Sequence, residues 1–367
     1  MADRTRPWRR AGVVTSGLII AAVWSAFMRP SSPHAAVSWS GTTMGTTYSI
    51  KLHKLPAGVA LEKVQSEVER VLEEINAKMS AFDPRSEISR WNAAPADAWQ
   101  PISPETATVL KEALRVCERS GGALDITVGP LVRLWHFGPA EGDGGAGRRA
   151  AVPDAESIRA ARERVDWKRI ELRSRPPAVR RGIEGGAVDL AAVAKGYGVD
   201  RVAECLEAFG IEHYLVEIGG EIRAKGRRPD GLPWAVGVET PRLDARQPQA
   251  VLQLEDAALA TSGDYRNYFE SEGRRFSHLI DPRTGRPIDH RLASVSVLHP
   301  SCMTADAWAT ALMILGPEEA WATAQREGLD VLLIERKGTG FESRMTPGFA
   351  ARIASPARGG LVLHETK

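Results

Sequence analysis

With 367 residues, of which 43% are hydrophobic and 26% charged, the chain has the length and composition of one large or two-lobed globular domain. The formal net charge is +2, but residues 1–36 hold five arginines and one aspartate, so removing their surplus of four leaves −2 on the remainder. A slightly acidic body is not expected to bind nucleic acid, and no nucleic-acid partner is predicted.

The first 36 residues have the pattern of a signal peptide or membrane anchor. Basic residues from Arg4 to Arg10 precede an uncharged apolar run at 11–28. Positive charges stay on the cytoplasmic side, so we expect the body on the periplasmic side of a bacterial inner membrane. No cysteine lies near the end of this run, so a lipoprotein anchor is not predicted. We divide the chain into this segment, a folded domain (37–352) and a C-terminal tail (353–367).

Apolar spacing and turn residues predict the elements of the body in chain order. The expected helices are 61–79, 103–120, 190–209, 304–315 and 317–327, with loops at 80–92 and 138–153. The expected strands lie within 37–55, at 169–172, near Val188, and at 214–218, 234–238, 251–254, 257–261, 276–280, 293–299 and 331–335. Strands and helices come in runs and do not alternate, which favours an α+β fold with antiparallel sheets and packed helices.

The three cysteines, Cys117, Cys205 and Cys302, form no C-x-x-C pair, so neither a zinc site nor a dithiol redox site is predicted. Cys117 and Cys205 lie in amphipathic helical patterns and are interpreted as small buried hydrophobic residues. A disulfide between two of the three remains open in an oxidising compartment.

The segment 188–200 places Asp189 and Lys195 six residues apart in a run of small residues, directly after a glycine pair. Small residues allow a ligand to approach the backbone, and a lysine supplies a point charge for phosphate. We interpret the segment as a helix that opens onto an anion. It is not a P-loop, because no Gly-Lys-Ser/Thr occurs, and Arg201 occupies the third glycine position of a dinucleotide fingerprint.

Asp306 and Thr310 lie four residues apart in a predicted helix and therefore share one face. A carboxylate and a hydroxyl are hard oxygen donors that suit Mg²⁺. The alternative is an ordinary capped helix, with Thr304 as its N-cap and Asp306 favoured by the helix dipole.

Three further residues have both a functional and a structural interpretation. His278, at the end of a predicted strand, suits either a general base or a structural role. Asp125 belongs to an Asp-x-Thr segment typical of a capped loop. Phe82 lies in a loop where it could stack on a flat ring, although core packing is the default for a phenylalanine.

Together and in this order, the motifs resemble the ApbE family, the FAD:protein FMN transferases. The matching segments are 43–46, 79–82 with 86–90, 125–131, 189–196, 218–222, 261–265, 278–287 and 304–312. They span nearly all of the chain beyond the first 36 residues. The resemblance implies the T-fold-like ApbE architecture, in a single two-lobed domain.

The resemblance also implies a reaction: a threonine hydroxyl of an acceptor protein attacks the FMN-side phosphorus of FAD, and AMP leaves. His278 would take the threonine proton, and Mg²⁺ would act as a Lewis acid on the pyrophosphate. The metal ligands implied are Asp306, Thr310 and the backbone carbonyl of Ala192. The FAD-binding positions implied are Met44, Phe82, Ala123, Leu124, Asp125, Asp189, Lys195 and Ile280. The expected acceptor is a membrane redox subunit.

Two positions depart from the family pattern. Ala191 and Ala192 replace a frequent glycine pair, which preserves a carbonyl ligand, and Glu221 replaces a frequent aspartate, which leaves its role open. Two alternatives also remain open: hydrolysis of FAD to FMN and AMP, in which water replaces the threonine, and a flavin-binding or carrier protein without turnover.

Overall fold

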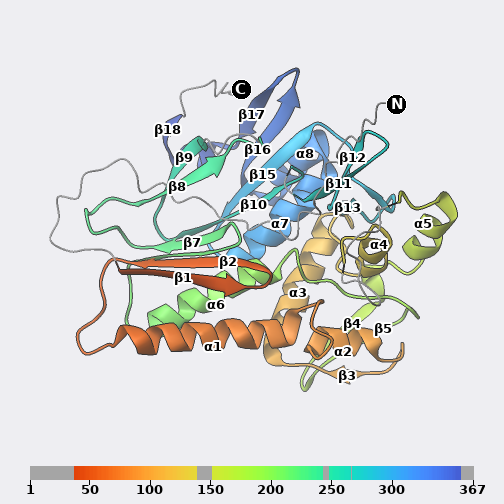
Figure 1. Cartoon of the computed structure of the whole chain (residues 1–367), viewed down its shortest axis with the longest axis horizontal. Helices are drawn as coiled ribbons and strands as arrows, with labels where there is room; N and C mark the ends of the chain where they lie inside the picture. Colours follow the sequence, from red (N-terminus) through yellow and green to blue (C-terminus); the bar gives the residue numbers. More distant parts are fainter. Residues whose placement is uncertain (1–36, 139–150, 243–247, 266, 357–367) are drawn as a thin grey trace, which may run out of the picture.

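An eight-stranded antiparallel sheet forms the centre of the computed structural model, which describes residues 37–138, 151–242, 248–265 and 267–356 (Figure 1). Its strand order is β1-β2-β6-β7-β10-β15-β16-β17. The strands are β1 Val37–Thr43, β2 Thr46–Leu52, β6 Tyr214–Ile218, β7 Glu221–Lys225, β10 Ala257–Gly263, β15 Leu292–His299, β16 Asp330–Lys337 and β17 Gly340–Met345. Since strands far apart in sequence are neighbours here, the order brings the predicted motifs together.

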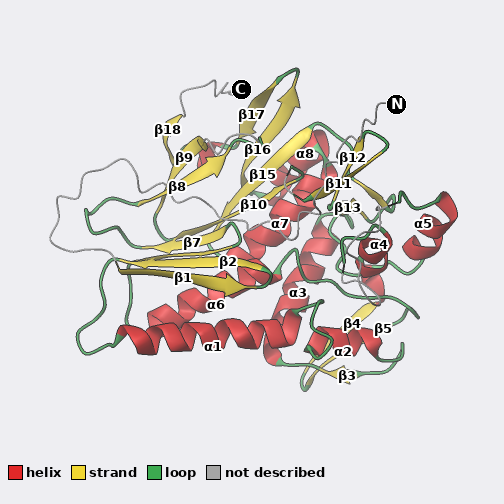
Figure 2. Cartoon of the chain, viewed as in Figure 1, coloured by secondary structure: helices red, strands yellow, loops and turns green. Residues whose placement is uncertain are grey.

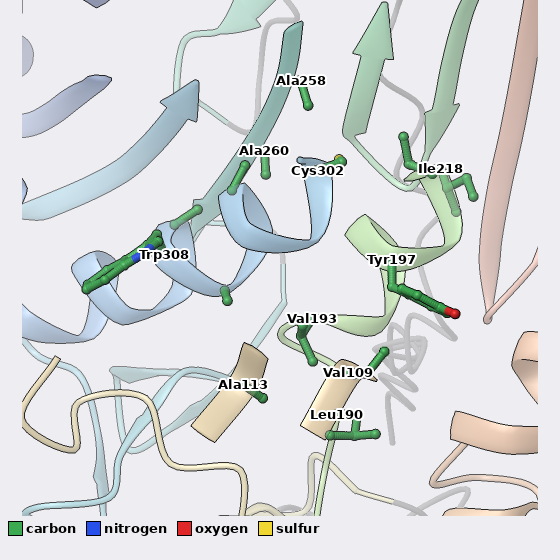
Figure 3. Packing of buried hydrophobic residues seen from close by; sticks show 14 of the residues in the cluster. Val109, Ala113, Leu190, Val193, Tyr197, Ile218, Ala258, Ala260, Cys302 and Trp308 are labelled. Atoms are coloured by element: carbon green, nitrogen blue, oxygen red, sulfur yellow. The ribbon is translucent and has the colours of Figure 1, made fainter. Parts of the chain in front are cut away.

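Helices cover one face of this sheet in two layers (Figure 2). The inner helices, α6 Ala194–Ala208 and α7 Cys302–Leu315, lie on the strands, while α1 Leu61–Met79 packs on α6 and α3 Pro104–Arg119 packs on α7. A further helix, α8 Pro317–Glu327, contacts both α7 and β16. Figure 3 shows the packing between these layers, with Ala258 and Ala260 of β10 beside α7 and Ala113 of α3 on the other side of that helix.

The opposite face of the main sheet is covered by a small antiparallel sheet of β8 Trp234–Glu239, β9 Pro248–Leu254 and β18 Ile353–Pro356. Alternation along each strand divides the buried residues between the two faces. In β6, for example, Val216 packs in the cluster with the helices, whereas Leu215 packs with Trp234 and Leu252 of the small sheet. The central strands of the main sheet, such as β6 and β15, are therefore buried on both faces.

Short elements complete the described chain. The helices are α2 Glu87–Ala93, α4 Gly129–Leu134, α5 Ala155–Arg162, the 3₁₀ turn Trp167–Arg169 and α9 Pro347–Ala350. The strands are β3 Gln100–Pro101, β4 Ile170–Ser174, β5 Pro177–Arg181, β11 Tyr268–Ser271, β12 Arg274–Ser277, β13 Ile280–Asp281 and β14 Arg286–Pro287. Trp135, after α4, packs against Phe276 of β12, so these pieces form a third apolar cluster.

The α+β prediction with antiparallel sheets in a single domain is confirmed. The amphipathic helix α1 has the predicted bounds, and its apolar positions at helical spacing are all buried: Val64, Val68, Val71, Leu72, Ile75 and Met79. The expected loop at 80–92 is wrong at its end, because Ser86 caps α2 through its side chain. The strand expected near Val188 is reduced to one isolated bridge between Ala187 and Val128.

Several other expectations are settled differently or lie outside the described residues. All three cysteines are free thiols, so the disulfide left open does not form in this structure. Residues 1–36 and most of the loop predicted at 138–153 are not described. The segment expected as a C-terminal tail begins with β18, which pairs with β9. Within the described ranges, no helix combines the length and apolarity needed to cross a membrane.

Candidate active site

A cavity of about 430 Å³ lies where the β6–β7 turn, the end of β10, the residues before α6 and the segment after α3 meet. This volume is typical of a small-molecule site. Ten of the twelve predicted site residues line it: Phe82, Ala123, Leu124, Asp125, Asp189, Ala192, Lys195, His278, Ile280 and Thr310. Five separate stretches of sequence therefore meet at one cavity.

The two remaining predicted residues, Met44 and Asp306, are not among the lining residues described. Met44 lies in the β1–β2 turn with φ 49°, and a Cβ added to Gly198 of α6 would lie 2.9 Å from its methyl carbon. A flavin contact for Met44 therefore stays a prediction. Asp306 is 1% exposed, and its carboxylate lies against Lys195, which does line the cavity.

The start of α6 differs from the prediction in a way that affects the site. The helix begins at Ala194, four residues later than expected, after a turn in which the Val193 and Ala194 N–H groups both donate to Leu190. Gly196 is the third residue of the helix, where an N–H has no partner within the helix, and this N–H donates to Asp306 Oδ2 at 2.9 Å. Ala192 therefore precedes the helix and is one of the residues that line the cavity.

Lys195 joins two buried carboxylates. Its Nζ lies 2.9 Å from Glu221 Oε1 and 3.4 Å from Asp306 Oδ1. Burial opposes the charge on the ammonium, but the attraction of Asp306 and then Glu221 outweighs it and raises the pKa of Lys195. Burial also raises the pKa of Glu221 and of Asp306, which Lys195 partly offsets. The sequence left the role of Glu221 open, and the structure places it as the ion-pair partner of Lys195.

Thr310 lies one turn beyond Asp306 on α7, as its spacing predicts, and shares a hydrogen bond of 3.1 Å with Ser262 of β10. The N-cap of α7 is Ser301, whose side chain accepts from the Thr304 N–H, so Thr304 as the cap is wrong. Capping therefore does not account for Asp306, which is buried against α6. Sequence reasoning missed Ser262, because its role depends on how β10 packs against α7.

The residues present fit a hard divalent cation. The carbonyl of Ala192, the carboxylate of Asp306 and the hydroxyl of Thr310 are the oxygen donors that Mg²⁺ prefers. Nearby, Glu221 Oε2 is buried and has no hydrogen-bond partner. Among the described residues, no three His, Cys, Asp or Glu side chains gather as a metal cluster, and the predicted set needs only one such residue.

His278 lies in the turn between β12 and β13 with its ring fixed by one backbone group. Its Nδ1 is 3.0 Å from the carbonyl oxygen of Asn267, which can only accept, so Nδ1 carries the proton and Nε2 keeps its lone pair. Burial lowers the pKa of His278 to about 4, and the ring is therefore neutral near pH 7. Sequence reasoning had no signal for Asn267, because it acts through its backbone.

The turn after α3 and the stretch before α6 lie side by side. Asp125 accepts from the Thr127 N–H at 2.8 Å and the Trp167 N–H at 3.2 Å, which confirms the capped-loop interpretation while Asp125 also lines the cavity. The Asp189 N–H donates to the Ile126 carbonyl at 2.7 Å.

Asn92 of α2 fixes the residue before Asp189. Its side-chain amide and carbonyl each bond the Val188 backbone at 2.8 Å. Sequence reasoning did not select Asn92, because its partner lies 96 residues away.

Comparisons with known proteins agree with one another. The model of the ApbE family matches residues 44–333. A FAD:protein FMN transferase of Vibrio cholerae is 45% identical over 317 residues, covering 86% of this chain and 92% of that protein. Its counterpart in Haemophilus influenzae is 40% identical over 337 residues, covering 91% of this chain and 96% of that protein.

Solved structures are similar over the same region. The flavin transferase ApbE from Vibrio cholerae matches with a TM-score of 0.80 at 43% identity, covering 87% of this chain and all of that one (100%). The apo flavinyl transferase ApbE of Pseudomonas stutzeri matches with a TM-score of 0.78 at 37% identity, covering 88% and 98% of the two chains.

Proposed function

This chain belongs to the ApbE family, and from that membership we propose that it is a FAD:protein FMN transferase. Its activity moves the FMN moiety of FAD to a hydroxyl group of an acceptor protein. The observation that carries this is the cavity, which brings together a neutral histidine, a charged lysine and the buried hydroxyl of Thr310, with the buried Asp306 carboxylate against the lysine.

The residues that line the cavity include both apolar and charged side chains. Phe82, Leu124 and Ile280 present apolar surface suited to the flat ring of a flavin. Lys195 presents an ammonium suited to the pyrophosphate, and Asp189 also lines the cavity. We therefore assign FAD to this cavity, with its flavin ring against the apolar side chains and its phosphates toward α6.

Ala192, Asp306 and Thr310 would hold Mg²⁺ beside the phosphates. When bound, the ion supplies Lewis acidity, because it neutralises charge that builds on the pyrophosphate oxygens. The chain itself keeps the Asp306 carboxylate oriented through the Gly196 N–H. Lys195 adds a second positive charge that needs no metal.

His278 is the proposed general base. Its Nε2 accepts the proton of the acceptor threonine, and the hydroxyl oxygen forms a bond to the FMN-side phosphorus. The phosphoanhydride bond breaks, and its electron pair leaves on the phosphate of AMP. The Asn267 carbonyl, which accepts from Nδ1, holds the ring in the tautomer that this step requires. Transfer of the proton leaves a phosphoester between FMN and the acceptor.

The proposal is tested by incubating the protein with FAD, Mg²⁺ and an acceptor domain that carries a threonine. We expect covalent flavin on the acceptor, detected as in-gel fluorescence and as a mass increase equal to FMN less water. Release of FMN and AMP at the same rate without an acceptor would indicate a hydrolase, and intact bound FAD would indicate a carrier. An acceptor in which alanine replaces the threonine is the matched control.

We also propose that the enzyme acts on the outer side of the cytoplasmic membrane, on a membrane redox subunit. The basic and apolar pattern of residues 1–36 supports the location, and the class of acceptor is what the family resemblance implies. Fractionation of expressing cells, together with the N-terminal mass of the protein, tests it. Recovery of the uncleaved protein in the cytoplasm alone would contradict the assignment.

A further inference from the structure

Helices α6 and α7 meet at two points on one face of α6. Gly196 and Asp200 are four residues apart and therefore lie on the same side of the helix. A Cβ at Gly196 would lie 2.3 Å from the carbonyl oxygen of Cys302, so only glycine permits this approach. Figure 3 shows Cys302 on the first turn of α7, close to the helix that carries Tyr197. The first contact places Asp306 on the Gly196 N–H.

The second contact is made by the carboxylate of Asp200, which is 7% exposed and accepts four hydrogen bonds. Its Oδ2 accepts from the Ser301 hydroxyl at 2.8 Å and the Met303 N–H at 3.0 Å. Its Oδ1 accepts from the Cys302 N–H at 3.0 Å and Arg223 Nη1 at 2.8 Å. Asp200 therefore binds the free N–H groups at the start of α7 from a neighbouring helix.

Strand β7 also pairs with α6 at two points. Glu221 pairs with Lys195 at 2.9 Å, and Arg223, two residues along the strand, pairs with Asp200 at 2.8 Å. Residues two apart on a strand point to the same face, so both pairs join β7 to α6. Each pair also contacts α7, through Asp306 in one case and through its first turn in the other. Only the first pair borders the cavity.

We propose that Asp200 is a positioning residue for the cation site. This inference rests on the proposed assignment of Mg²⁺ to Ala192, Asp306 and Thr310. Asp200 holds the first turn of α7 in register with α6. Asp306 lies one turn further along α7, so a shift of that first turn displaces its carboxylate from the carbonyl of Ala192. Mg²⁺ demands near-ideal octahedral geometry, so its binding is sensitive to such a shift. Asp200 itself does not line the cavity.

The test is the Asp200→Asn variant of the whole protein. Asparagine has the shape of aspartate but only one acceptor oxygen. Its NH₂ group would therefore face hydrogen-bond donors that the carboxylate of Asp200 now binds. The readout is the Mg²⁺ concentration that gives half of the metal-dependent rise in Tm, measured with FAD present. We expect this concentration to increase about tenfold, the usual effect of losing a group that orients a metal ligand. FAD affinity without metal is expected to change less than about twofold, because Asp200 does not contact the cavity.

Matched variants separate the possible outcomes. Ser103→Ala removes a side-chain cap from α3, remote from the site, and should lower Tm without changing the Mg²⁺ requirement. Arg223→Gln removes one donor to Asp200 but keeps the three donors of the first turn of α7. It should increase the Mg²⁺ concentration required by about threefold, and it provides the test if Asp200→Asn does not fold. Asp306→Ala should abolish the Mg²⁺-dependent rise in Tm. If it does not, the cation assignment fails.

If Asp306→Ala behaves as expected, Asp200→Asn and Arg223→Gln decide whether Asp200 is a positioning residue. A Mg²⁺ requirement in Asp200→Asn within about twofold of the unaltered protein, with a lower Tm, would leave Asp200 a purely structural cap. Equal losses of Mg²⁺ and FAD affinity would also overturn the inference. An increase confined to Mg²⁺, larger in Asp200→Asn than in Arg223→Gln, supports it.

Discussion

At the scale of single residues, the cavity holds two basic groups in opposite protonation states. Burial removes the charge from His278, whereas Lys195 keeps its charge because Asp306 and Glu221 lie against it. The lysine charge also contributes to lowering the pKa of His278. A neutral base and a fixed positive charge can therefore coexist near pH 7, an arrangement suited to phosphoryl transfer to a hydroxyl.

This protonation pattern predicts the effects of a substitution and of pH. His278→Ala should lower the transfer rate by about 100-fold or more, while FAD affinity changes by only a few fold. Because the pKa of His278 is lowered from 6.5 to about 4, the neutral form persists as the pH falls, and the rate should decline only as the pH approaches 4. Initial rates between pH 4 and 8, at saturating FAD, measure this.

The same shift has a consequence for stability. The unfolded protein binds this proton below pH 6.5, whereas the folded protein binds it only near pH 4. The free energy of unfolding therefore decreases as the pH falls through that window.

The control for His278→Ala is His213→Ala, at a histidine that does not line the cavity. Equal losses of rate and FAD affinity in His278→Ala would make His278 a binding residue.

At the scale of elements, the β6–β7 turn sets the position of Glu221. Gly219 and Gly220 have φ values of 59° and 104°, which favour glycine, and the Gly220 N–H donates to Glu217 Oε1 at 2.8 Å. Glu217 is 2% exposed, and burial raises its pKa to about 7. The turn before Glu221 is therefore closed by the carboxyl group of Glu217, whose charged form is disfavoured by burial.

Glu217→Gln should stabilise the protein at alkaline pH. The folded pKa is raised, so the folded state holds a proton between pH 4.5 and 7 that the unfolded state has released, and stability falls as the pH rises through this window. Glutamine keeps an acceptor for the Gly220 N–H without the charge. We expect Tm to rise by roughly 2–4 °C at pH 8 and much less at pH 5, by calorimetry.

Glu212→Gln, at an exposed position, is the control for this substitution and should leave Tm unchanged at both pH values. A lower Tm of Glu217→Gln at pH 8 would show that the ionised carboxylate is what closes the turn. The transfer rate provides a second readout, since the turn lines the cavity.

At the scale of the whole molecule, the cavity exists only when distant parts of the fold are assembled. Its lining runs from Phe82, before α2, to Ile314, in α7, and includes β8 of the small sheet. The small sheet is completed by β18, the last described strand, which pairs with β9. The end of the described chain therefore supports one wall of the site through two rows of strand pairing.

Two truncations test where the folded domain ends. A chain ending at Arg352 lacks β18 and should have a Tm roughly 2–4 °C lower, because the pairing with β9 is lost. A chain ending at Pro356 retains the strand and should match the full-length protein. Equal Tm values for the two truncated chains would place the boundary before β18, as the division at residue 352 implies.

The sequence predicted the elements with strong local signals and missed those without them. The apolar spacing of α1 and the caps of α3 are local, and both helices were found. The edge strand β17 and the seven-residue α2 carry weaker patterns and were missed. The partner of the Gly196 N–H could not be read from the sequence, because Asp306 lies 110 positions away.

By itself, the sequence determined the α+β class, the family resemblance and the residue types of the site, since motif order and spacing are properties of the chain. The segment around Asp189 and Lys195 indicated only an anion. The tertiary structure decided the rest: that Glu221 pairs with Lys195, that Asn267 sets the tautomer of His278, and that Asp200 joins α6 to α7. These depend on contacts between segments remote in sequence, which close packing brings within hydrogen-bond distance.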